Sequence, residues 1–169
     1  MLNSRETLLT SRKNQTYMTP KFSPAARTKA RERVLQALYQ WQLAEHDIPT
    51  IEAYFMQEQD MKKVDIAYFE LLLHNIPATI NELHKQLLPF LDRELEQLDP
   101  IERAILYIGG YELRYCQDVP FRVVLNEGIE LAKKFGATES YKFVNGVLDK
   151  YARFLHPQQR VMKKVTLRS

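Results

Sequence analysis

The chain has little cysteine and little glycine, and each shortage excludes a class of protein. The single cysteine, Cys116, rules out an internal disulfide and a cysteine-rich zinc site, and it suits a reducing compartment. Only five glycines occur in 169 residues, and segments rich in leucine, alanine, glutamate and lysine favour helices over strands. No run reaches the ~18 apolar residues of a membrane span, and the amino-terminus lacks a secretory signal. We therefore expect a cytoplasmic protein with no membrane partner.

The arrangements that usually carry catalysis or metal binding are also missing. No glycine-rich loop precedes a lysine and a hydroxyl, as nucleotide hydrolysis of the P-loop kind requires. The four histidines are scattered, with no pair at metal-ligand spacing on one helix. Cys116 is better interpreted as an inert, buried thiol than as a nucleophile. We predict no catalytic residue, no metal and no cofactor, so the protein is expected to act by binding and not as an enzyme.

Charge is distributed unevenly, although the net charge of the whole chain is only +3. Residues 1–33 hold eight basic and two acidic side chains, a net charge of +6. Residues 34–156 hold 12 basic and 19 acidic side chains, a net charge of −7, and residues 157–169 add four basic ones. This distribution suggests that the two basic ends bind a polyanion and that the acidic body binds a different partner. Solvated tails are the simpler explanation of the ends taken alone.

Helical periodicity runs through the chain, and no strand-like alternation persists, so we predict an all-α fold with about seven helices. Ser23 and Pro24 open a first helix that is expected to reach His46. Asp47 opens a short second helix through Gln59, and residues 60–91 are mostly helical with a kink at Pro77. Residues 1–22 are expected to be a flexible extension, 23–156 the domain, and 157–169 a basic tail. Met18 is a possible alternative start of translation.

The second half of the domain carries the clearest helix signals. Asp99-Pro100-Ile101-Glu102 combines a cap, a proline in the first turn and a glutamate three residues after the cap. Gly109-Gly110 inside that helix is locally unfavourable, so we expect a neighbouring helix to approach closely there. The next helix opens after Asp118-Val119-Pro120 and stops at Gly136, and Thr138 is expected to cap the last one.

Two surfaces remain as candidates for ligand binding. The first helix begins with Arg27, Lys29, Arg31 and Arg33, although cations oppose the helix dipole at an amino-terminus. A bound anion would offset that local cost. Lys142 and Phe143 lie in the first turns of the last helix, where a cation can meet phosphate and an aromatic ring can stack on an unpaired base. From composition alone, Phe143 is more often a core residue, and the sequence leaves its role open.

These segments resemble a known family in order and spacing. The chain from about Pro24 to Phe154 is similar to the NusB family of bacterial transcription antitermination factors. The resemblance rests on AARTKARERVLQALYQWQL, YFELLL, LDPIERAIL, DVPFRVVLNEGIELAKKFG and FVNGVLDK. It implies two packed three-helix lobes that bind the boxA element of single-stranded RNA together with the ribosomal protein NusE. In that role the protein would join the RNA polymerase antitermination complex on ribosomal RNA operons.

The resemblance also assigns residues to each surface. By position it implies RNA-binding residues at the starts of the first and last helices, with two weaker candidates on the first helix: Arg27, Lys29, Arg31, Glu139, Lys142 and Phe143, then Gln36 and Tyr39. Glu102 and Tyr111 are candidates for the partner or the RNA edge. Thr28 and Tyr107 depart from the family, because arginine is common at both positions.

Two rival functions keep the same fold. A similar helical domain forms the amino-terminal RNA-binding part of certain ribosomal RNA cytosine methyltransferases, but a catalytic domain would have to follow it. The other rival is a helical adaptor whose acidic body binds only protein and whose basic ends only aid solubility. Binding of a boxA-like RNA separates the antitermination hypothesis from the adaptor.

Overall fold

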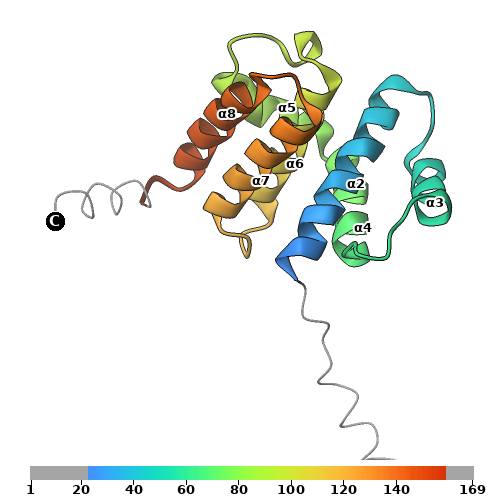
Figure 1. Ribbon diagram of the computed structural model, residues 1–169. Coiled ribbons are helices and arrows are strands. Elements are labelled where there is room, and N and C mark those ends of the chain that lie inside the picture. The colour runs from blue at the N-terminus through green and yellow to red at the C-terminus, as the bar shows by residue number, and fades with distance from the viewer. Residues whose placement is uncertain (1–22, 159–169) are drawn as a thin grey trace, which may run out of the picture.

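The computed structural model describes residues 23–158, which form helices joined by short loops (Figure 1). The seven α-helices of this part are α2 (Pro24–Leu43), α3 (Ile48–Glu58), α4 (Ile66–Ala78), α5 (Ile80–Leu87), α6 (Pro100–Tyr115), α7 (Phe121–Phe135) and α8 (Ser140–Leu155). Two short 3-10 helices, η1 (Leu88–Phe90) and η2 (Leu95–Gln97), lie between α5 and α6. No strand occurs in the described residues, which confirms the all-α prediction. Predictions about residues 1–22 and 159–169, Met18 included, lie outside the described residues.

The helices form two lobes that meet at α6. The amino-terminal lobe consists of α2, α3 and α4, and the carboxy-terminal lobe consists of α6, α7 and α8, with the short α5 packed on α6 (Figure 1). Helix α6 also packs against α2 and α4, so it belongs to the core of both lobes. Ten consecutive residues of α6, from Ala104 to Leu113, are buried. A helix that is covered on every side is the expected centre of a small all-α domain.

Side-chain caps fix the starts of four helices, three of which the sequence indicated at Ser23, Asp47 and Asp99. The caps at Ser23, Asp47, Asp65 and Asp99 each accept a hydrogen bond from a backbone N–H of the first helical turn. Thr138 was wrongly expected to cap α8: Glu139 precedes that helix, and its side chain makes no capping bond. Helix α2 ends at Leu43, three residues before the expected His46.

Two glycines let α8 approach its neighbours closely. A Cβ added to Gly109 of α6 would lie 2.6 Å from Cδ1 of Leu148, and one added to Gly128 of α7 would lie 3.0 Å from the same atom. Leu148 is fully buried in the notch that the two glycines leave. The expected close approach at Gly109 is therefore confirmed. None of the helices in the described part of the chain is long and apolar enough to cross a membrane.

Candidate nucleic-acid interface

The basic residues at the start of α2 point in different directions, because successive side chains of a helix are rotated by about 100°. Arg27 is partly exposed, with its guanidinium 4.4 Å above the ring of Tyr68. Its Nε lies 3.7 Å from Asp65, and its Nη1 lies 3.6 Å from Asp118. Lys29 Nζ lies 3.3 Å from Glu32, and its side chain is 42% exposed. These two cations are placed where a ligand can reach them.

Arg31 lies in the interior, away from solvent. Its side chain is 2% exposed, and its Nε and Nη2 each donate a hydrogen bond of 2.8 Å to the carboxylate of Glu112. Burial disfavours the guanidinium charge, but the hydrogen bond and charge of Glu112 outweigh it and raise the pKa of Arg31. Arg31, expected at the RNA surface, therefore joins α2 to α6 in this structure. A signal was present in the sequence, because Arg31 shares a helical stripe with Leu35 and Leu38.

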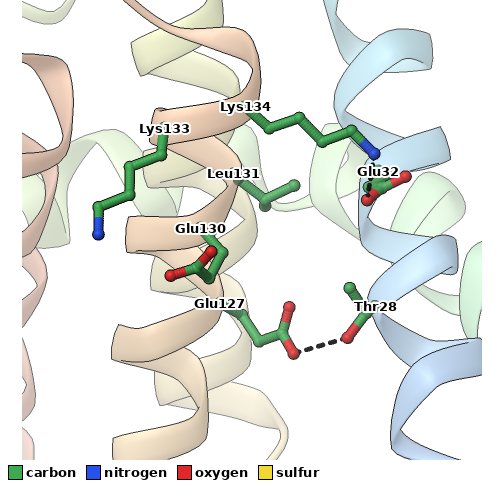
Figure 2. A pocket seen from close by; sticks show the side chains of 7 residues that line it. All are labelled: Thr28, Glu32, Glu127, Glu130, Leu131, Lys133 and Lys134. Carbon is green, nitrogen blue, oxygen red and sulfur yellow. Dashed lines mark hydrogen bonds and ion pairs between the residues drawn. The ribbon is translucent and has the colours of Figure 1, made fainter. Parts of the chain in front are cut away.

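A groove runs between α2 and α7, and we call it the α2–α7 groove. It has a volume of about 500 Å³ and is lined by Thr28, Glu32, Glu127, Glu130, Leu131, Lys133 and Lys134 (Figure 2). Thr28 Oγ1 donates a hydrogen bond of 2.7 Å to Glu127, and Lys134 Nζ donates one of 2.9 Å to Glu32. Both bonds bridge the groove from one helix to the other, as the dashed lines in Figure 2 show. Lys133 points away from α2 in the same view.

Glu32 pairs with cations from both helices that form this groove. Its oxygens pair separately with Lys29, from the same helix, and with Lys134, from α7. Burial acts to raise the pKa of Glu32, but the hydrogen bonds and charges of Lys134 and Lys29 prevail and lower it. The carboxylate stays charged, and it holds the two lysines on opposite sides of itself. Because each lysine has only this one anionic partner among the residues that the structure describes, either can turn to a second anion while Glu32 keeps the other.

The start of α8 presents the second predicted cluster. Lys142 Nζ lies 2.7 Å from Glu139, and both side chains are exposed. Phe143 is half-buried: it packs against the hydrophobic core, and the Arg93 guanidinium lies 5.0 Å above its ring. Ser140 is buried, and its Oγ donates a hydrogen bond of 2.7 Å to Glu102. Glu102 thus supports the first turn of α8 from α6.

The remaining predicted residues are divided between surface and interior. Tyr39 is exposed, and Gln36 is half-buried with its Oε1 accepting a hydrogen bond of 3.1 Å from Arg33. Tyr111 is 8% exposed, and its ring lies 5.0 Å from that of Tyr115. Tyr107 is buried and shares a hydrogen bond of 2.6 Å with His84. Burial raises the pKa of Tyr107 to about 12, so its hydroxyl stays neutral.

The structure brings the two predicted clusters to opposite sides of α7, which lies between α2 and α8 (Figure 1). Lys134 lies near the carboxyl end of α7, and α8 begins only a few residues later. The α2–α7 groove and the end of α7 therefore lie between the start of α2 and the start of α8. Sequence reasoning assigned no role to the bridging residues Glu127 and Lys134. Their spacing of seven places them on one helical face, but nothing in the sequence says that this face meets α2.

Other kinds of site have no support in the described part of the chain. Within residues 23–158 no group of three or more histidine, cysteine, aspartate or glutamate side chains could hold a metal ion. Cys116 is buried, and burial together with the charge of Glu112 raises the pKa of its thiol to about 11. The burial of Cys116 expected from the sequence is therefore confirmed, and the inertness of its thiol stays a prediction.

Comparison with known proteins gives a consistent result. The model of the NusB family matches residues 28–153. The transcription antitermination protein NusB of Alcanivorax borkumensis is 57% identical over 133 residues, which cover 79% of this chain and 89% of that protein. The protein of the same name from Sodalis glossinidius is 52% identical over 137 residues, which cover 81% of this chain and 99% of that one.

Solved structures give the same match in three dimensions. A structure of T. maritima NusB has a TM-score of 0.65 at 29% identity and covers 75% of this chain and 90% of that one. A structure of the antitermination factors NusB and NusE in complex with double-stranded RNA has a TM-score of 0.71 at 25% identity. It covers 78% of this chain and 98% of that one.

Proposed function

This chain belongs to the NusB family, and from that membership we propose that it is an antitermination factor that binds boxA-type RNA together with NusE. In this proposal it acts in the cytoplasm, as part of the RNA polymerase antitermination complex on ribosomal RNA operons. Its relatives carry the name of transcription antitermination protein, and a structural neighbour is described as bound to NusE and RNA. The chain would act by binding and would catalyse no reaction.

One observation carries the RNA part of this proposal. Accessible cations lie at the start of α2, and an accessible cation and an aromatic ring lie at the start of α8. The α2–α7 groove lies between these two clusters. A single strand needs cations along its backbone and aromatic surfaces for its bases. We propose that Lys29 and Lys142 contact phosphates and that the exposed part of Phe143 stacks on a base. Arg27, whose guanidinium lies above the ring of Tyr68, also contacts the RNA.

The other predicted residues are assigned further contacts with RNA or NusE, apart from Arg31. We propose that Glu139 accepts hydrogen bonds from a base or sugar next to Lys142, and that Tyr39 and Gln36 extend the surface along α2. Arg31 is left out of the contact set because its guanidinium is buried against Glu112. We propose Glu102 and Tyr111 as residues near NusE, with Glu102 acting through the first turn of α8.

Titration of a fluorescent boxA-like RNA, with and without NusE, tests the proposal. We expect binding by the chain alone and tighter binding when NusE is present. Because the RNA of the structural neighbour is double-stranded, the same element should be offered as a single strand and as a duplex. Preference for the single strand supports stacking on Phe143, because a duplex does not expose its base faces.

The controls are a scrambled RNA of equal length and the variant Lys142→Ala. A chain that binds NusE but neither RNA would be the protein adaptor and not an antitermination factor. Equal affinity for boxA and scrambled RNA would show charge-driven binding without sequence preference.

A further inference from the structure

A second pocket lies at the start of α2, on the side away from α7, and we call it the lysine pocket. It has a volume of about 410 Å³ and is lined by Ser23, Ala25, Ala26, Lys29, Lys62, Lys63 and Val64. Among the described residues that line it, all charged ones are cations, and none is a carboxylate. Lys62 and Lys63 come from the loop between α3 and α4, which neither the basic cluster nor the resemblance included. We propose that this pocket binds phosphates of the RNA backbone, a step that rests on the proposed RNA-binding function.

The loop that carries the two lysines is held against α2. The backbone N–H of Asp65 donates a hydrogen bond of 3.1 Å to the carbonyl of Ala26, and Arg33 Nη2 donates one of 3.2 Å to the carbonyl of Asp60. Within the loop, Val64 N–H donates to the carbonyl of Met61 over 3.2 Å. The pocket therefore has a fixed wall, so less conformational entropy is lost when a ligand binds.

The two lysines point outward because the residues before and after them in the sequence are buried. Met61 and Val64 are each only 9% exposed and belong to the hydrophobic core, whereas Lys62 and Lys63 between them are exposed. Neither ammonium group has a hydrogen bond or ion pair with any residue in the range 23–158. Both retain their donors for a ligand.

The nearby carboxylates make contacts of their own and do not line the pocket. Asp60 accepts a hydrogen bond of 3.1 Å from the backbone N–H of Lys62. Asp65 is buried, accepts from the N–H of Tyr68 and faces Arg27. The partner of Lys29 is Glu32, which Lys134 continues to neutralise when Lys29 turns to a phosphate. Three cations therefore converge on the pocket at little electrostatic cost elsewhere.

An extended polyanion fits this arrangement better than a small anion. The lysine pocket and the α2–α7 groove lie on either side of the start of α2, and Lys29 is adjacent to both, through its place in the pocket and its pair with Glu32. The first turn of α2 contains no acidic residue, so its N–H groups add to the positive potential. We infer that the RNA strand continues past the start of α2 toward α4, beyond the surface the resemblance assigns.

The test compares two double variants that lose the same charge. Lys62→Ala/Lys63→Ala removes two cations of the pocket, and Lys85→Ala/Lys150→Ala removes two exposed lysines from α5 and α8 of the other lobe. Affinity for boxA-like RNA is measured with NusE present, from about 0.05 to 0.5 M salt. Each lost phosphate contact lowers the slope of log K against log salt by ~0.7 and the affinity about fivefold at 0.1 M salt. We expect the pocket variant to lose about 25-fold in RNA affinity and ~1.4 in the magnitude of the slope of log K against log salt.

The outcomes separate this inference from the function on which it rests. A pocket variant that matches the control in affinity and slope overturns the lysine pocket, while RNA binding by the unaltered chain still supports the proposed function. No RNA binding by the unaltered chain overturns both. Affinity for NusE alone is measured in parallel and should not change. If it falls while RNA affinity is kept, the pocket takes an acidic segment of the partner protein, and the inference is wrong.

Discussion

Arg31 of α2 and Glu112 of α6 form a buried ion pair with two hydrogen bonds of 2.8 Å each, at the junction of the two lobes. The carboxylate of Glu112 also accepts a hydrogen bond from the hydroxyl of Tyr68 on α4. One side chain of α6 thus holds the two helices of the amino-terminal lobe that pack on it. Burial, followed by the charge of Glu112, raises the pKa of Tyr68, so the phenol keeps the proton it donates.

Arg31→Met should destabilise the fold strongly, because it leaves the charge of Glu112 buried without its cation. Removing one partner of a buried pair lowers the free energy of unfolding by about 3–5 kcal/mol. Arg31→Met/Glu112→Leu should recover much of that loss, because two apolar side chains remove both charges. Urea unfolding of the three proteins measures the difference. If Arg31→Met unfolds at the same urea concentration as the unaltered chain but loses RNA affinity, Arg31 reaches the ligand after all.

Gly109→Ala should destabilise the protein because its new methyl group would overlap Leu148. The nearest atoms of Leu148 would lie 2.6 and 2.9 Å from the added Cβ, and Leu148 is fully buried with little room to move. Overpacking of this kind typically lowers the free energy of unfolding by about 1–3 kcal/mol. Gly146→Ala on α8 is the matched control, since nothing lies within 4 Å of its added Cβ. It should raise the free energy of unfolding by up to ~1 kcal/mol, through helix propensity.

Local signals in the sequence were enough for the all-helical fold, for several helix starts and for the crowded position in α6. Asp99 and Pro100 marked the start of that helix, and Gly109 marked a close approach, because a glycine inside a helix is locally unfavourable. Neither signal names the residue that approaches. Leu148 lies 39 positions away, and only packing of α8 into the notch identifies it.

The candidate site was harder to predict because it depends on contacts between distant segments. Thr28 meets Glu127, and Glu32 meets Lys134, across about 100 residues of sequence. Arg31 was assigned to the RNA surface by the family resemblance and by its place in the basic cluster, whereas its helical phase pointed inward. Charge type predicts the kind of ligand, but the direction of each side chain depends on what the opposite helix offers.

Cys116 should react with thiol reagents only after unfolding. Its pKa is raised to about 11, chiefly by burial, so about one thiol in a thousand is ionised at pH 8. Labelling with a chromogenic disulfide reagent at pH 8 should be slow in buffer and rapid in urea. The native rate should rise about tenfold for each pH unit up to about pH 11, as the thiolate fraction grows. Fast native labelling at pH 7 would contradict a buried, neutral thiol.

Phe143→Leu distinguishes a stacking residue from a core residue. Leucine keeps the apolar contacts of the half-buried ring but cannot stack on a base or lie flat under Arg93. We expect the free energy of unfolding to change by less than about 1.5 kcal/mol, as for other apolar exchanges of similar volume. RNA affinity should fall about tenfold, because base stacking on one aromatic ring contributes about 1–3 kcal/mol. Phe154→Leu, on the same helix at a site 69% exposed, should change neither quantity. A large loss of thermal stability in Phe143→Leu, with affinity unchanged once the protein is folded, would assign Phe143 to the core.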